Sequence, residues 1–362
     1  MSPAGFHLPP IPLYFSDELN QFNFGSGHPF TGTRFKEFLE LLRKAKILEQ
    51  CNIIKPIPAT DDELRLAHSE EYLAIVQKAM KIGGWLSIDT PATRGAVNAQ
   101  RLIAGSGLQA ARLLVDTYEN IAHTFGGFHH AGPDYGEGFC IYNDVAISAK
   151  ALIERHGLDR VMILDSDAHH GNGTMDIFYK DPKVLFVSIH QDPRTIYPGK
   201  GFVWETGEGE GEGYTVNIPM PPFSGNNQYG MAFDEIIEPL AREFRPQLFI
   251  RNGGSDPYYG DELTMLGLDL DGLAEVSRRT RDVALETSGK LLDMTVSGYG
   301  NWVKYGWLAQ FCGCEVLNTD YKAFSPKQPH RSPPCTEDSL TRATDSMLNS
   351  LKREIGKYWK IF

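Results

Sequence analysis

The chain has 362 residues, 41% of them hydrophobic and 22% charged, and its formal net charge is −11 at pH 7. These are ordinary values for a globular enzyme, and the acidic balance argues against a protein that binds nucleic acid. No apolar run approaches the ~20 residues that cross a membrane, and the N-terminal sequence lacks the basic start and apolar core of a signal peptide. Five cysteines without CxxC spacing favour reduced thiols, so we expect a cytoplasmic protein with no membrane partner.

The chain predicts an irregular lead-in over residues 1–32, with a short strand at 11–14, and then an alternation of helices and strands. Thr33 is the expected N-cap of the first helix, and Ser69 marks a restart within the second. The predicted helices occupy 33–50, 60–80, 96–118, 143–155, 226–244 and 270–289. The later predicted strands occupy 122–126, 161–165, 184–190, 247–251 and 291–297. Strands that alternate with helices indicate βαβ units and a mostly parallel sheet.

Two segments have a composition of their own. The Gly/Glu repeat at 207–213 is too short for a repeat architecture and predicts a flexible surface loop. The sequence AFSPKQPHRSPP, which starts at residue 323, is typical of a linker, and an amphipathic helix is predicted over 336–362. We therefore predict one domain over 1–322 that carries the chemistry. Residues 323–362 would form a C-terminal linker and helix that pack on or extend the same domain.

Polar groups are concentrated in LDSDAHHGNG (164–173), directly after a predicted buried strand. In an extended chain Asp165 and His169 would lie roughly 13 Å apart at ~3.3 Å per residue, too far to bind one ion. Either the chain bends after Asp167, or one of Asp165, Asp167 and His169 is not a metal ligand. Asp and His with a carboxylate from elsewhere would form the three-ligand set of catalytic zinc. The alternative is a strand end with solvated acids and a helix-capping asparagine.

Three other segments place reactive groups beside glycines. His129 and His130 suit general acid–base catalysis near neutral pH. Asp256 could supply the third metal ligand, and Tyr299 could donate a hydrogen bond to a developing oxyanion. Taken singly, each could have a plain structural role: packing or surface for the histidines, a turn for Asp256 and a loop aromatic for Tyr299. Together they predict a metal-dependent hydrolase of an amide-like bond.

Four motifs closely resemble the zinc-dependent histone deacetylase family, which also includes acetylpolyamine amidohydrolases and acetoin-utilisation proteins. The motifs are GGFHHAGPDYGEGFCIYND (126–144), ILDSDAHHGNGT (163–174), SIHQDPRTIYPGKG (188–201) and SGYGN (297–301). Weaker matches at 25–35, 63–73 and 89–93 extend the resemblance over roughly residues 11 to 310. It implies the arginase–deacetylase fold, a single three-layer α/β/α domain with a mostly parallel eight-stranded sheet.

The resemblance also implies roles for single residues. The zinc ligands would be Asp167, His169 and Asp256, and a structural potassium ion would lie near Asp165, Asp167, His169 and Ser188. The catalytic residues would be His129 and His130, their partners Asp165 and Asn172, and the oxyanion-stabilising Tyr299. The substrate would contact Asp89 at the rim and Gly138, Phe139 and Tyr197 along the channel. A neutral Asn172, where many relatives have Asp, should stabilise protonated His130 less than a carboxylate would.

The implied reaction removes acetyl or other acyl groups from lysine side chains or similar alkyl amines. Acetylated lysine peptides or proteins, acetylated polyamines and small acetylated amines are the candidate substrates, and iron(II) or cobalt(II) could replace zinc. Two rival interpretations are a non-catalytic acyl-lysine binder and a ureohydrolase-like enzyme, although Gly171 stands where a second metal would need an Asp. Two departures, Ser297 and Pro257-Tyr258-Tyr259, are expected to alter selectivity without removing a catalytic group. The protein could also form a homo-oligomer.

Overall fold

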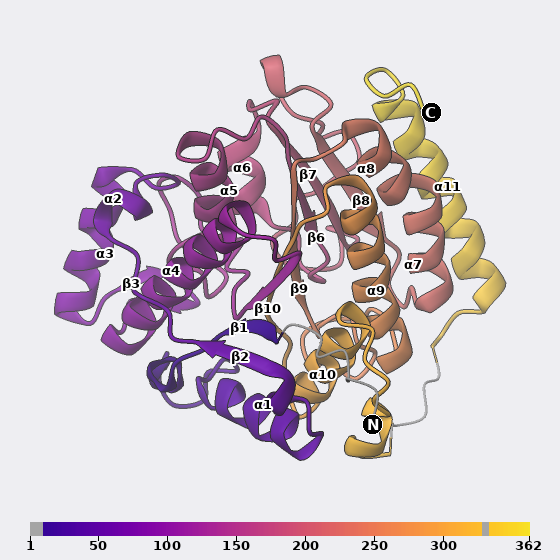
Figure 1. Cartoon of the computed structure of the whole chain (residues 1–362). Coiled ribbons are helices and arrows are strands. Elements are labelled where there is room, and N and C mark those ends of the chain that lie inside the picture. Colours follow the sequence, from indigo (N-terminus) through magenta and orange to yellow (C-terminus); the bar gives the residue numbers. More distant parts are fainter. Residues whose placement is uncertain (1–9, 328–332) are drawn as a thin grey trace, which may run out of the picture.

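The computed structural model describes residues 10–327 and 333–362 (Figure 1). Residues 1–9 of the predicted lead-in and residues 328–332 of the predicted linker lie outside the described residues. Within the described part, the chain forms a single α/β domain around one large sheet. No described helix is long and apolar enough to cross a membrane.

Eight strands of the described residues form this sheet, and each pair of neighbouring strands is parallel. Their order across the sheet is β2-β1-β5-β10-β9-β6-β7-β8. The strands are β1 (Ile11–Tyr14), β2 (Cys51–Ile54), β5 (Ile121–Thr124), β6 (Val161–Asp165), β7 (Val184–Gln191), β8 (Thr215–Met220), β9 (Leu248–Gly254) and β10 (Leu291–Ser297). A separate hairpin joins β3 (Trp85–Ser87) and β4 (Thr90–Pro91). The predicted parallel α/β architecture is confirmed.

Helices cover both faces of the sheet, with α4 and α5 on one side and α7, α8 and α9 on the other (Figure 1). The helices are α1 (Thr33–Lys44), α2 (Asp61–Leu64), α3 (Glu70–Ile82), α4 (Arg94–Asp116), α5 (Asp144–Glu154), α6 (Asn172–Phe178), α7 (Asn226–Ala232), α8 (Glu238–Phe244), α9 (Leu270–Thr287), α10 (Val303–Cys314) and α11 (Glu337–Ile355).

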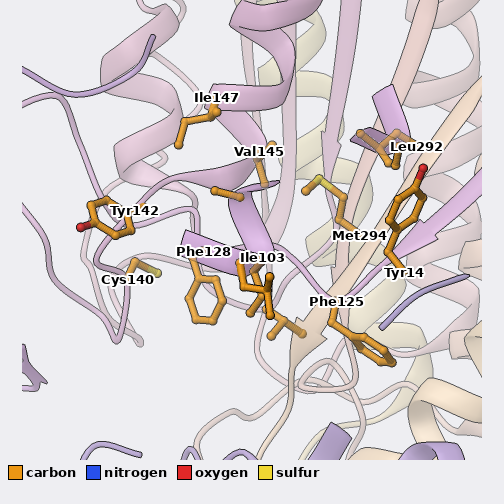
Figure 2. Close-up of a cluster of buried hydrophobic side chains, with 14 of the residues drawn as sticks. Tyr14, Ile103, Phe125, Phe128, Cys140, Tyr142, Val145, Ile147, Leu292 and Met294 are labelled. Carbon is orange, nitrogen blue, oxygen red and sulfur yellow. The ribbon is translucent and has the colours of Figure 1, made fainter. Parts of the chain in front are cut away.

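The hydrophobic core is divided by the sheet into two clusters. In β6, Val161 and Ile163 belong to one cluster and Met162 and Leu164 to the other, because successive side chains of a strand point to opposite faces. Figure 2 shows part of the first cluster, including Phe125. A strand buried on both faces is a continuous apolar run, which is why β6 and β7 were recognisable from sequence.

Several predicted boundaries were wrong. The first helix ends at Lys44 rather than near residue 50, because Lys46 takes a left-handed conformation with φ 58° before β2 begins. Its N-cap is Gly32 and not Thr33. The helix predicted over 226–244 is interrupted by a π-helical turn at Phe233–Ile237. The prediction also missed β2 and β8, the two outer strands, where β2 is largely exposed and β8 contains a proline.

The Gly/Glu segment at 207–213 is exposed at residues 208–210 but packed at two glycines. A Cβ at Gly211 would lie 2.7 Å from the backbone of Tyr179, and one at Gly213 would lie 2.5 Å from the Tyr358 ring. Trp359 also donates a hydrogen bond from Nε1 to the carbonyl of Gly213 at 2.8 Å. The predicted surface loop is thus exposed at 208–210, while the Tyr179 backbone packs against Gly211 and residues beyond α11 cover Gly213.

The C-terminal helix α11 packs along α7 and β8, at the outer side of the second cluster (Figure 1). Its buried residues recur at helical spacing and include Leu348, Leu351 and Ile355. Thr336 caps its first turn by accepting a hydrogen bond from the backbone N–H of Ser339 at 3.2 Å. This part of the tail thus contributes apolar surface to the core of the domain.

Candidate active site

The carboxyl ends of three neighbouring strands supply most polar residues of the candidate site. Asp165 ends β6 and lies beside Asn252 of β9 in the strand register, and β10 ends at Ser297. Because parallel strands end at the same edge of a sheet, the loops that follow them converge there. A pocket at this edge is lined by residues that include His129, His130, Asp167, His169 and Tyr299.

The chain turns directly after β6, and this turn brings three side chains together. The backbone N–H of His169 donates to Asp167 Oδ1 at 2.7 Å, which closes the turn. His169 Nδ1 lies 3.1 Å from Asp167 Oδ1 and 3.1 Å from Asp256 Oδ2. One ligand atom from each of the three residues lies within 4.8 Å of the others, and all three residues are buried. The loop after β9 thus supplies the carboxylate that the β6 segment lacks.

The charges of this group fit a divalent cation. Burial and the negative charge of Asp167 raise the pKa of Asp256 to about 7. Burial lowers the pKa of His169, but the two carboxylates outweigh it and raise the pKa to about 10. Without an ion, two buried carboxylates therefore face each other across one imidazole. Two carboxylate oxygens and one imidazole nitrogen fit zinc with an open coordination position, so the residues suit the metal that the resemblance implies.

The tandem histidines each have a different partner. His129 Nδ1 donates to Asp165 Oδ2 at 2.6 Å, and His130 Nδ1 donates to Asn172 Oδ1 at 2.7 Å. Both imidazoles are buried, and their ring centroids lie 4.2 Å apart. Asn252 Nδ2 donates to Asp165 Oδ1 at 3.0 Å and so holds the carboxylate that orients His129. His129, Asp165 and Asn252 thus form one hydrogen-bonded group, and His130 and Asn172 form a second; the two imidazoles line the pocket.

The pKa values of the two histidines are shifted in opposite directions. Burial lowers the pKa of His129, but the charges of Asp165 and Asp167 outweigh it and raise the pKa to about 9. Burial, together with the charges of His129 and His169, holds the pKa of His130 well below its ordinary value. One histidine therefore keeps a proton while its neighbour is free to accept one, as general acid–base catalysis requires.

Tyr299 is buried next to the carboxylate group. Its ring lies perpendicular to that of His169 with centroids 6.3 Å apart, and its backbone N–H donates to Asp261 Oδ2 at 2.7 Å. Burial and the charges of Asp167 and Asp256 raise the pKa of Tyr299 well above its ordinary value. The phenol is therefore a hydrogen-bond donor near neutral pH.

Gly138 and Phe139 form one wall of the pocket in an unusual backbone conformation. Both residues are left-handed, with φ of 55° and 69°, and a Cβ at Gly138 would lie 2.4 Å from His130 Cδ2. The Tyr197 ring packs 5.1 Å from the His130 ring and is 41% exposed. Asp89 Oδ1 accepts a hydrogen bond from the Gly138 N–H at 3.1 Å. The four residues expected to contact the substrate thus lie next to His130 or on the loop that carries Gly138.

Ser188 and Ser297 lie behind the carboxylates. Ser188 lies beside Asp165 in the register of β6 and β7, and its Oγ is hydrogen-bonded to His190 Nδ1 at 2.8 Å. The potassium site that the sequence placed here stays a prediction. Ser297 Oγ donates to Asp256 Oδ1 at 2.9 Å, so this departure from the family pattern contacts one of the candidate metal ligands.

Comparisons with known proteins assign the chain to a family. A histone deacetylase domain is matched over residues 28–311. A probable deacetylase of Archaeoglobus fulgidus is 35% identical over 369 aligned residues, covering 97% of this chain and 99% of that protein. The chain belongs to the histone deacetylase family. Acetoin utilization protein AcuC of Staphylococcus aureus (strain MRSA252) is 36% identical, covering 82% of this chain and 79% of AcuC.

A solved structure of the HDA15 HD domain superposes with a TM-score of 0.82 at 25% sequence identity, covering 97% of both chains. The eight-stranded parallel sheet of the histone deacetylase family is therefore shown for this chain by its own topology and by this match. Membership of the family supports an enzyme that acts on acetylated substrates.

Two residues at the site, Arg34 and Glu137, had no role predicted from the sequence. Arg34 is buried and donates from Nη1 to the carbonyls of Val296 and Gly298, both at 3.1 Å, on either side of the β10 end. Glu137 accepts a hydrogen bond from Asn172 Nδ2 at 2.7 Å. Both residues stand inside motifs shared with the family, but their partners lie far along the chain. Local sequence therefore gave no signal of these contacts.

Proposed function

We propose that the chain is a zinc-dependent amidohydrolase that removes acetyl or other acyl groups from lysine side chains or similar alkyl amines. One observation carries the proposal: three convergent ligand atoms lie beside two buried histidines of opposite proton affinity. The metal ligands would be Asp167, His169 and Asp256. The catalytic residues would be His129, His130 and Tyr299, with Asp165 and Asn172 as the partners of the histidines.

When bound, zinc supplies a Lewis acid that polarises the amide carbonyl and lowers the pKa of water. His130 removes the proton of the attacking water at Nε2, because its Nδ1 is bonded to Asn172. Tyr299 donates its hydroxyl hydrogen bond to the oxyanion that develops on the carbonyl oxygen. A protonated histidine then donates to the leaving amine, and His129 is held in that state by Asp165.

The walls of the pocket suit an alkyl stem that ends in an acylated amine. Phe139 and Tyr197 would contact the stem, and Gly138 holds this wall directly against His130, where a side chain would clash. Asp89 would hold backbone amides of a peptide substrate at the rim. An acetylated polyamine presents the same stem without a peptide backbone, so it is the alternative substrate. Relatives named probable deacetylase and acetoin utilization protein are consistent with either.

The test measures acetate release by zinc-reconstituted protein from an acetyl-lysine peptide and from N-acetylputrescine, side by side. Zinc-dependent turnover of the peptide supports a protein deacetylase, and preference for the polyamine supports the alternative. Asp167→Ala is the blank, and Tyr299→Phe should keep zinc but lose about 10²–10³-fold in turnover. Absence of turnover on both substrates by wild-type protein would contradict the proposal and favour a binder of acylated amines. Normal turnover by Tyr299→Phe would contradict the oxyanion role.

A further inference from the structure

Asn172 connects His130 to the loop that forms the pocket wall. Its Oδ1 accepts from His130 Nδ1 at 2.7 Å, and its Nδ2 donates to Glu137 Oε1 at 2.7 Å. The second hydrogen of the amide points toward the Tyr135 hydroxyl oxygen at 3.3 Å. That hydroxyl donates its own hydrogen to Asp176 Oδ2 at 2.5 Å, so towards Asn172 it is an acceptor. The amide oxygen of Asn172 therefore faces a donor, and its amide nitrogen faces two acceptors.

This arrangement fixes which way the amide of Asn172 faces. Oxygen and nitrogen of an asparagine amide are nearly equal in shape, and only the hydrogen-bond partners decide between the two orientations. The reversed amide would place its carbonyl oxygen against the Glu137 carboxylate and against a Tyr135 oxygen whose hydrogen is already used. The carbonyl oxygen of Asn172 would then face two oxygens that can only accept, and the lost hydrogen bonds would destabilise this orientation. An aspartate at position 172 would need no such control, because its two oxygens are equivalent.

We propose that Glu137 is a positioning residue that, through the amide of Asn172, fixes the tautomer of His130. With Oδ1 held toward the imidazole, Nδ1 carries the hydrogen and Nε2 keeps its lone pair for the pocket. The inference rests on the proposed function for the use made of that lone pair. The tautomer itself is a property of the protein and can be measured without substrate.

Glu137 is well placed for this task because its loop is attached to His130 at further points. Gly138 packs against the imidazole so closely that an added Cβ would lie 2.4 Å from it. The Tyr197 ring also packs against this imidazole, with its centroid 5.1 Å from that of His130. One carboxylate thus links the wall that would contact the acyl-amine stem to the partner of the proposed base.

The first experiment compares two substitutions at one position. Glu137→Ala removes the acceptor for Asn172 Nδ2 and should lower kcat about tenfold or more, the size seen for residues that orient catalytic groups. Glu137→Gln keeps an oxygen that accepts from Nδ2 and should recover most of that loss. Asp134→Ala, an exposed acidic residue of the same loop, is the matched control and should behave as wild type. Equal kcat values for Glu137→Ala and wild type would overturn the proposal.

The second measurement reads the tautomer directly by NMR of protein with ¹⁵N-labelled histidine, with the His130 signals identified by their loss in His130→Gln. Wild type and Glu137→Gln should show one tautomer with hydrogen on Nδ1, whereas Glu137→Ala should show a mixture. An unchanged tautomer in Glu137→Ala would overturn the proposal even if activity fell. If wild-type protein shows no turnover, the proposed function fails, but this spectrum still decides the role of Glu137.

Asn172→Asp supplies a third test, because a carboxylate at this position accepts from His130 in either orientation. In the Glu137→Ala background it should restore kcat to within about threefold of wild type, a coupling expected only of residues in contact. In the wild-type background it should lower kcat. The carboxylates of Asp at position 172 and of Glu137 would repel each other, because Asn172 Nδ2 and Glu137 Oε1 lie only 2.7 Å apart. Equal effects of Asn172→Asp in both backgrounds would overturn the proposal.

Discussion

Two groups of mostly buried ionisable side chains lie on or next to the strands of this sheet, and they differ in how their charges are balanced. The site cluster consists of Asp165, Asp167, Asp256, His129 and His169. The sheet-core cluster consists of His123, Arg251, Asp293 and Glu315, the first three of which belong to β5, β9 and β10. Among the described residues, each region also brings three potential metal-ligand atoms within 4.8 Å: Asp167, His169 and Asp256 in one, and His123, Cys314 and Glu315 in the other.

In the sheet-core cluster every charge has a direct partner. Arg251 donates to Asp293 through Nε and to Gln310 Oε1 at 2.8 Å. His123 lies between two carboxylates, with Nδ1 2.9 Å from Asp293 and Nε2 2.6 Å from Glu315. Two cations therefore face two anions, and the cation that a metal would supply is already provided by the protein.

In the site cluster three carboxylates face two histidines, and the cluster opens to a pocket. Asp165 is paired with His129, whereas oxygens of both Asp167 and Asp256 converge on His169 Nδ1. Residue types that can bind a metal are thus common to both clusters. Unbalanced charge and an open side are what distinguish a site that needs a cation from a network that is complete without one.

Asp256→Ala should have the largest effect, because it removes one of the three proposed metal ligands from the unbalanced cluster. We expect zinc content after dialysis to fall from about one per chain to near zero, and added zinc should no longer raise the melting temperature. Metal analysis and thermal unfolding with and without zinc measure both effects. Asp234→Ala, at an exposed aspartate, is the control. One zinc per chain in dialysed Asp256→Ala would contradict the assigned ligand set.

Arg251→Met should affect stability and not metal binding. It leaves Asp293 without its guanidinium partner in a site where both side chains are at most 3% exposed, so unfolding should become easier by about 3–5 kcal/mol. Urea denaturation measures this loss, and zinc content of the folded variant should equal that of wild type. Arg242→Met removes an exposed arginine paired with Glu238 and Glu286 and should cost at most about 1 kcal/mol. Loss of zinc from folded Arg251→Met would remove the distinction between the two clusters.

Much of the fold could be predicted because its central strands are buried on both faces. Short apolar runs such as 161–165 and 291–297 are typical of such strands, and their alternation with helices implies parallel pairing. The outer strands were missed for the converse reason. β2 has an exposed middle, and β8 is interrupted by Pro219, which an edge strand tolerates. Positions that only tertiary packing decides, such as Gly213 under the Tyr358 ring beyond α11, left no local signal.

The candidate site could be predicted as a set of residues but not as a network. Glycines next to Asp, His and Tyr at strand ends indicated where chemistry lies, and the family motifs named the members. The contacts that orient them join residues far apart in the chain, such as Ser297 with Asp256 and Glu137 with Asn172. Sequence also gave no sign of the sheet-core cluster, because single charges inside apolar strands do not reveal their partners.

The smallest expected effect concerns the pH dependence of stability and comes from His123. Burial lowers the pKa of this side chain, but Asp293 and Glu315 outweigh it and raise the pKa to about 9, above the ordinary 6.5. A raised pKa means that protonated His123 stabilises the fold fully below pH 6.5 and that this stabilisation is lost as the pH rises through 9. Urea denaturation gives the free energy of unfolding of wild-type protein and of His123→Gln. We expect the difference between the two proteins to be larger at pH 6 than at pH 9.5 by up to about 3 kcal/mol. Taking the difference between the two proteins cancels the titration of the site cluster, which both retain. A difference that is the same at both pH values would show that His123 is neutral in the folded protein, and the sheet-core cluster would then carry an unbalanced negative charge as the site cluster does.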